Sequence, residues 1–137
     1  MQILDALSDI MIASLFGGMV FLPSIVAPLV FKVLEPTDAG RFLRSLFPRY
    51  YAFVIATATA AALSTFAIQP WHAALLFGVA GSTWMVRQWL VPRINEWRDA
   101  SLAGDSSATL KFDRGHRLSV WINMAQMLAV LGILIVR

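Results

Sequence analysis

The last apolar segment of the chain carries polar side chains whose types and spacing could build a functional site. The segment GHRLSVWINMAQM precedes the apolar run LAVLGILIV, and polar residues recur in it at spacings of three, four and three: His116, Ser119, Asn123 and Gln126. On an α-helix these spacings place all four side chains on one face, which we call the polar seam. An amide that enters hydrocarbon without a partner is costly, so Asn123 and Gln126 must face protein or water.

Three interpretations of the polar seam are open. In the first, it lines the path of a transporter or channel-like protein and opens to the cytoplasmic face, where His116 acts as donor, acceptor or cation. In the second, the protein is a structural or assembly factor that binds a partner or a lipid head group, and its amides only hydrogen-bond the helices together. In the third, His116 binds haem or a metal in a small membrane oxidoreductase, although His72 lies on the other side of the membrane and cannot share one iron with it.

Catalytic chemistry finds little support in the sequence. The chain has no cysteine, which removes thiolate nucleophiles and cysteine-based metal sites. The long uncharged runs hold no Asp or Glu by definition, so neither an antiporter carboxylate nor an aspartic protease pair is available inside the membrane. His116 and Ser119 lack an orienting acid for nucleophilic catalysis. We therefore predict no catalytic residue, no metal site and no cofactor.

The composition indicates an integral membrane protein. The chain is 58% hydrophobic and 14% charged, whereas soluble domains are about half apolar and about a quarter charged. Charged residues are absent from residues 10–31, 50–86 and 118–136; a helix needs roughly 20 residues to cross a bilayer core of about 30 Å, so the middle run is long enough for two spans. We predict one all-α domain over residues 1–137, with four transmembrane helices at about 8–34, 50–68, 71–92 and 116–136.

The basic residues predict the orientation of this bundle. All but Arg137 of the 11 Lys and Arg residues lie in the connections 32–49 and 87–117. Because cytoplasmic loops are enriched in Lys and Arg, we expect both connections in the cytoplasm and both termini outside, in the periplasm of a bacterium whose inner (plasma) membrane holds the protein. The same placement explains the net charge of +3 without a nucleic-acid partner.

The cytoplasmic connections suggest two further features. The stretch TDAGRFLRSLF predicts a short amphipathic interfacial helix at about 38–47. A second candidate site for an anion or a lipid head group combines residues at the cytoplasmic ends of the helices: Arg49, Tyr50, Arg87 and Arg93. Arg87 lies at least a turn inside Pro92 and needs an anionic or carbonyl partner.

Small residues and prolines predict how the helices pack. Along the second span, small residues recur every fourth position: Ala52, Ala56, Ala60 and Ser64. This stripe indicates close helix packing within the chain or between protomers, and we expect a homo-oligomer in contact with membrane lipids and with a membrane protein partner. Pro23 and Pro28 predict a kink in the first span, either as a hinge or as a static bend.

The sequence also resembles a known family over nearly its whole length. The segments GGMVFLPSIVAPLVFKVLEPTDAGRFLRSLFPRYY, VPRIN and FDRGHRLSVWIN resemble the transmembrane protein 205-like family, small four-span proteins of bacteria and eukaryotes described mainly as a domain of unknown function. The family pattern usually has a Leu before the histidine, where this chain has Gly115. The resemblance implies the four-span topology and no particular reaction.

Overall fold

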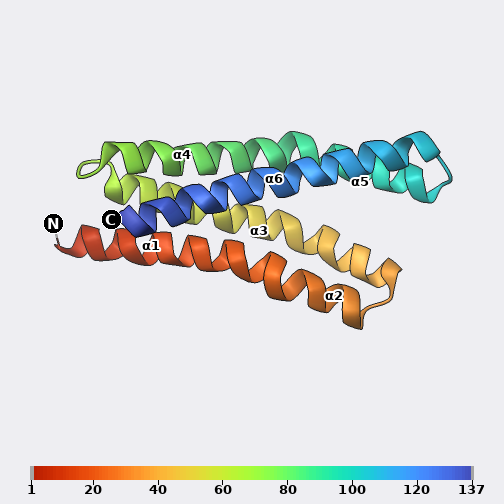
Figure 1. Cartoon of the computed structure of the whole chain (residues 1–137), viewed down its shortest axis with the longest axis horizontal. Coiled ribbons are helices and arrows are strands. Elements are labelled where there is room, and N and C mark those ends of the chain that lie inside the picture. The colour runs from red at the N-terminus through yellow and green to blue at the C-terminus, as the bar shows by residue number, and fades with distance from the viewer. Residues whose placement is uncertain (1, 137) are drawn as a thin grey trace.

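The computed structural model describes residues 2–136 and forms a bundle of four long helical rods (Figure 1). The elements in chain order are α1 Gln2–Phe21, the π-helical turn η1 Leu22–Val26, α2 Ala27–Val33, α3 Pro36–Thr65, α4 Pro70–Met85, the π-helical turn η2 Val86–Leu90, α5 Val91–Leu102 and α6 Ser106–Val136. Residues 2–136 contain no strand, so the predicted all-α class is confirmed.

The prolines of the first rod are accommodated in a π-helical turn. In η1 the N–H of Ala27 donates to the carbonyl of Leu22, five residues back, directly before Pro28. The third rod repeats this arrangement, because the N–H of Val91 donates to the carbonyl of Val86 directly before Pro92. A widened turn makes room for the proline ring, which lacks an N–H and would otherwise crowd the preceding turn. The rods stay helical through both turns.

Two predicted helix boundaries are therefore wrong. The third helix does not end near residue 92 but continues as α5 to Leu102. The predicted interfacial helix at 38–47 and the span at 50–68 are one helix, α3, with Pro48 inside it. Pro48 removes a single backbone hydrogen bond, and the apolar side of the α3 start is not free to lie on a membrane surface because Ala39 and Leu43 pack against Val30 of α2.

The connection before α6 has the predicted bend. Gly104 adopts φ 101°, a conformation that glycine tolerates best. Asp105 then caps α6, since its Oδ1 accepts the N–H groups of Ser107 at 2.9 Å and Ala108 at 3.2 Å. The Ser107 hydroxyl and these N–H groups hold the pKa of the Asp105 carboxyl below its usual range. As the sequence suggested, α6 begins well before residue 116.

The small-residue stripe of the second span only partly packs inside the chain. Ala52 and Ala56 are exposed, whereas Ala58, Ala61 and Ala62 are fully buried in the core. Four residues exceed one helical turn by about 40°, so a stripe of period four winds around the helix from the outside to the buried Ser64 at its end. The core between α1, α3, α4 and α6 is built by other positions, among them Leu15, Val54, Leu76 and Val130.

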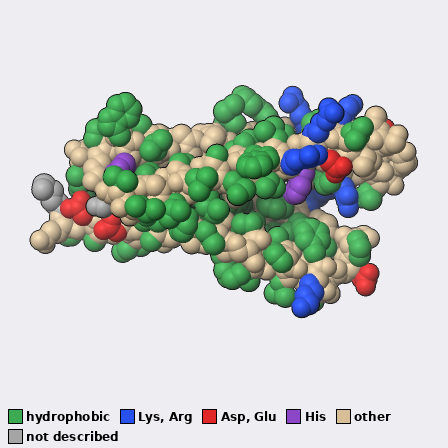
Figure 2. Space-filling view, in the orientation of Figure 1, with side chains coloured by type: hydrophobic (Ala, Val, Ile, Leu, Met, Phe, Trp, Pro, Cys, Tyr) green, Lys and Arg blue, Asp and Glu red, His purple; other side chains and the backbone are tan. Residues whose placement is uncertain are grey.

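Three helices are long and apolar enough to cross a membrane, and they indicate a membrane protein: Gln2–Val33, Pro36–Thr65 and Ser106–Val136. The rod that begins at Pro70 runs alongside them (Figure 1) but is less apolar, with His72 near its start and Arg87 and Gln88 in η2. The beginning of α1 and the end of α6 lie at the same end of the bundle. On the face shown in Figure 2, Lys and Arg side chains gather at the opposite end.

Candidate functional site: a polar pocket inside the bundle

Asn123 of the polar seam is bonded to α3. The Tyr50 hydroxyl donates to Asn123 Oδ1 at 2.7 Å, and only 8% of Tyr50 is exposed. The ring of Tyr50 is held by its neighbours Phe47 and Tyr51, at centroid distances of 6.5 and 5.5 Å. Tyr50, which the sequence assigned to a head-group site, thus places its hydroxyl on the polar seam.

Gln126, one helical turn further along α6, is bonded to α4. Its Nε2 donates to Ser82 Oγ at 2.7 Å and to Thr83 Oγ1 at 3.1 Å. Ser82 Oγ in turn donates to the carbonyl of Gly78 at 2.6 Å, which leaves its oxygen to accept from Gln126. Two successive amides of α6 therefore tie this helix to α3 and to α4.

The two amides lie on the wall of a small cavity, which we call the polar pocket. The residues around it are Tyr50, Tyr51, Val54, Thr83, Val86, Ser119, Ile122, Asn123 and Gln126. Its volume of about 10 Å³ is room for about one water molecule. An amide offers both donors and acceptors, yet within residues 2–136 Asn123 Nδ2 and Gln126 Oε1 have no partner. One polar group of each amide therefore remains for water or a solute.

The polar seam divides at its cytoplasmic end. Ser119 lines the polar pocket while its hydroxyl donates to the carbonyl of His116 at 2.7 Å, a common arrangement for a helical serine. His116 does not line the pocket; it is exposed, and its ring stacks on Phe112 with a centroid distance of 5.9 Å and an interplanar angle of 11°. The structure thus brings Ser119, Asn123 and Gln126 together and leaves His116 at the surface.

The predicted anion site is distributed over different surfaces. Arg49 borders an apolar groove beside α1 that neither Arg87 nor Arg93 lines. Its Nη1 donates to the carbonyl of Ser45 at 2.7 Å and to Ser45 Oγ at 3.0 Å. Arg93 is exposed. The Nε of Arg87 is buried and meets no acceptor in the described part of the chain, so the expected need of Arg87 for an anionic or carbonyl partner remains.

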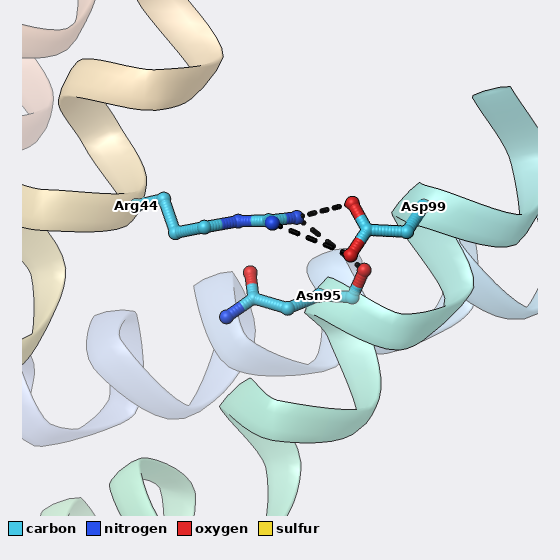
Figure 3. A network of polar contacts seen from close by, with 3 residues as sticks. All are labelled: Arg44, Asn95 and Asp99. Atoms are coloured by element: carbon cyan, nitrogen blue, oxygen red, sulfur yellow. Dashed lines mark hydrogen bonds and ion pairs between the residues drawn. The ribbon is translucent and has the colours of Figure 1, made fainter.

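An ion pair that the sequence did not indicate joins two arms of the bundle. We call α2 with the start of α3 the first arm, and α5 with the start of α6 the second arm; they diverge at the end away from the termini (Figure 1). Figure 3 shows Arg44 of α3 reaching Asp99 and the backbone of Asn95 on α5. Arg44 Nη2 donates to Asp99 Oδ1 at 2.6 Å and Nη1 to Asp99 Oδ2 at 3.3 Å. These hydrogen bonds hold the pKa of the Asp99 carboxyl below its usual range.

Sequence reasoning also missed the partners of the seam on α4. Ser82 was counted among small packing residues, and Thr83 was not singled out. The available signal was the polar pair Ser82-Thr83 inside an apolar run. In residues 2–136, no three side chains of His, Asp or Glu gather where they could hold a metal ion.

Fold and pocket together define an all-helical membrane protein with a polar pocket inside an apolar bundle. A family model described as "Domain of unknown function (DUF4149)" matches residues 10–101. The chain belongs to this family. The match covers Tyr50, Ser82 and Thr83 and ends before α6, which carries the polar seam. Neither a search of curated proteins nor a search of solved structures found a match.

Proposed function

We propose that this protein is a small transporter or channel-like protein that passes small uncharged polar solutes through the polar pocket. The observation that carries the proposal is the half-used bonding capacity of Asn123 and Gln126. Each amide bonds one neighbouring helix and keeps a second polar group for the cavity. In the conformation described, the pocket has room for about one water molecule, so this conformation is a closed state.

The chemistry of the pocket favours an uncharged solute. Its polar lining consists of hydroxyl and amide side chains, and no Lys, Arg, Asp, Glu or His lines it. A bare ion would lose its hydration shell there without a compensating opposite charge. An uncharged solute with hydroxyl or amide groups would instead exchange hydrogen bonds to water for bonds to Asn123 and Gln126.

The topology belongs to the same proposal. We infer that α4 and the first turn of η2 form the fourth span, because this rod runs beside the other three (Figure 1). The basic end of the bundle would face the cytoplasm and the termini the periplasm of a bacterial inner membrane. Protomers would assemble into a homo-oligomer, for which exposed small residues such as Ala52 and Ala56 offer a close-packing surface. The resemblance to the transmembrane protein 205-like family supports the four-span topology.

The test is solute permeation in proteoliposomes. Purified protein is reconstituted, and vesicle volume after an osmotic step in urea, glycerol or sucrose is followed by stopped-flow light scattering. We expect faster entry of at least one of the two smaller solutes than in empty liposomes, and a severalfold loss of this gain in Asn123→Leu. The matched control is Met124→Leu, the exposed neighbouring position. Entry rates equal to those of empty liposomes for all solutes would contradict the proposal.

A second function is favoured by the bonds that the amides do make. Tyr50–Asn123 and Gln126–Ser82 connect three helices, as expected of a structural or assembly protein whose polar groups only hold the bundle together and whose surface binds a lipid or a membrane protein. If so, Asn123→Leu lowers the melting temperature in detergent, and the wild type shows no permeation. Binding of haem or a metal by His116 has less support, because its exposed ring packs on Phe112.

A further inference from the structure

A second and larger cavity lies on the other side of Tyr50. It is a groove of about 340 Å³ between the first rod and α3, which we call the lipid groove. Its walls are apolar side chains, among them Leu22 and Val26 of η1 and Leu46 and Phe53 of α3. Of the described residues that line it, Arg49 alone is charged.

The groove owes its shape to one close approach and one divergence. At its inner end Gly18 lies under the ring of Phe53; a Cβ on Gly18 would come within 2.4 Å of Phe53 Cε1. From there toward the basic end, the first rod passes through η1 and the first arm opens, as Figure 1 shows for α2 and α3. Side chains of η1 and α3 therefore face each other across the groove without filling it.

The groove faces lipid in a membrane and has the length of an acyl chain in one leaflet. Its walls belong to Gln2–Val33 and Pro36–Thr65, two helices long and apolar enough to cross a membrane. From Gly18 to Val26 the first rod rises about 12 Å at 1.5 Å per residue. One leaflet contributes about 15 Å, half of the hydrocarbon thickness of about 30 Å. The groove thus fits most of one extended chain.

Arg49 supplies a charge at the edge of this groove. Its Nη1 bonds Ser45, one turn nearer the basic end, so the guanidinium is turned toward that end of the bundle. In the part of the chain described, no carboxylate pairs with it; the printed ion pairs of arginine are Arg41–Asp38 and Arg44–Asp99. A guanidinium has five N–H donors and binds phosphate through two at once. The remaining donors of Arg49 are available to such a group.

We propose that the lipid groove binds one acyl chain of an anionic phospholipid, with the lipid phosphate on Arg49. An anionic lipid is favoured over a zwitterionic one because the Arg49 charge has no carboxylate partner. The site does not depend on solute transport. It does touch the polar pocket, since Tyr50 lines both cavities, and the bound chain would pack against the residue that holds Asn123.

The test is native mass spectrometry of the protein released from nanodiscs that contain equal amounts of phosphatidylglycerol and phosphatidylcholine. We expect the wild type to retain phosphatidylglycerol over phosphatidylcholine, and Arg49→Gln to lower this ratio about fivefold, the effect of one arginine at a lipid surface. The matched control Arg41→Gln lies on the same helix and outside the groove, so the ratio should stay near the wild-type value. An unchanged ratio in Arg49→Gln would overturn the proposal.

A second pair of variants tests the acyl-chain part. Leu46→Trp fills the groove and should reduce the retention of both lipids, whereas Leu63→Trp, at an exposed position of the same helix, should not. Val26→Phe fills the groove from η1 and replaces Leu46→Trp if that protein does not fold. Equal lipid retention in the groove-filling and control variants would refute the site. A change in the number of protomers without a change in lipid would assign the groove to a second copy of the chain and also refute it.

Discussion

The hydroxyl of Tyr50 gives the sharpest test of the polar pocket. Tyr50→Phe removes a buried 2.7 Å hydrogen bond to Asn123 Oδ1 and leaves the aromatic packing in place. Hydrogen bonds between membrane helices contribute about 0.6 kcal/mol on average and up to about 1.7 kcal/mol. We expect a cost within this range and toward its upper part, because the Oδ1 left behind can be rehydrated only by a pocket with room for about one water.

Tyr51 provides the control for this prediction. It lines the same pocket, and its hydroxyl has no hydrogen-bond partner among residues 2–136, so Tyr51→Phe should leave the free energy of unfolding nearly unchanged. The assay is reversible unfolding in mixed micelles, completed with Asn123→Leu as a double-mutant cycle. A coupling energy indistinguishable from zero, or equal costs for Tyr50→Phe and Tyr51→Phe, would refute the pairing of α3 with α6 through these two side chains.

Two further predictions concern the arms. Because Arg44 lowers the pKa of the Asp99 carboxyl, the pair is intact above the ordinary pKa of an aspartate and is lost as the pH falls through the lowered value; Arg44→Gln should raise the Asp99 pKa in a carboxyl ¹³C NMR titration, and an unchanged pKa would exclude the ion pair in solution. Gly115 allows α5 to approach α6, since a Cβ there would lie 2.8 Å from Trp97 Cζ3, whereas Gly132 of the same helix has open space. Gly115→Ala should therefore be about 1–3 kcal/mol less stable than Gly132→Ala, measured by the same unfolding assay, and equal stabilities would show that Trp97 moves freely.

Charge-free runs located the helices because a chain inside a membrane must satisfy its backbone groups within each helix. The predicted ends failed at prolines. Pro48 and Pro92 were taken as boundaries, yet α3 continues through the first and the third rod through the second. Whether one missing hydrogen bond ends a helix depends on packing elsewhere, such as that of Ala39 and Leu43 on α2, and this packing is invisible in a local sequence pattern.

The sequence by itself determined the membrane class, the helical fold and the existence of the polar seam, because these follow from composition and from the helical period of 3.6 residues. The tertiary structure alone decided which partners the seam meets. Tyr50 and Asn123 are bonded over a separation of 73 residues and Arg44 and Asp99 over 55. Such pairs depend on the rotation and register of each helix against its neighbours, which are set by how the side chains of several helices fit together.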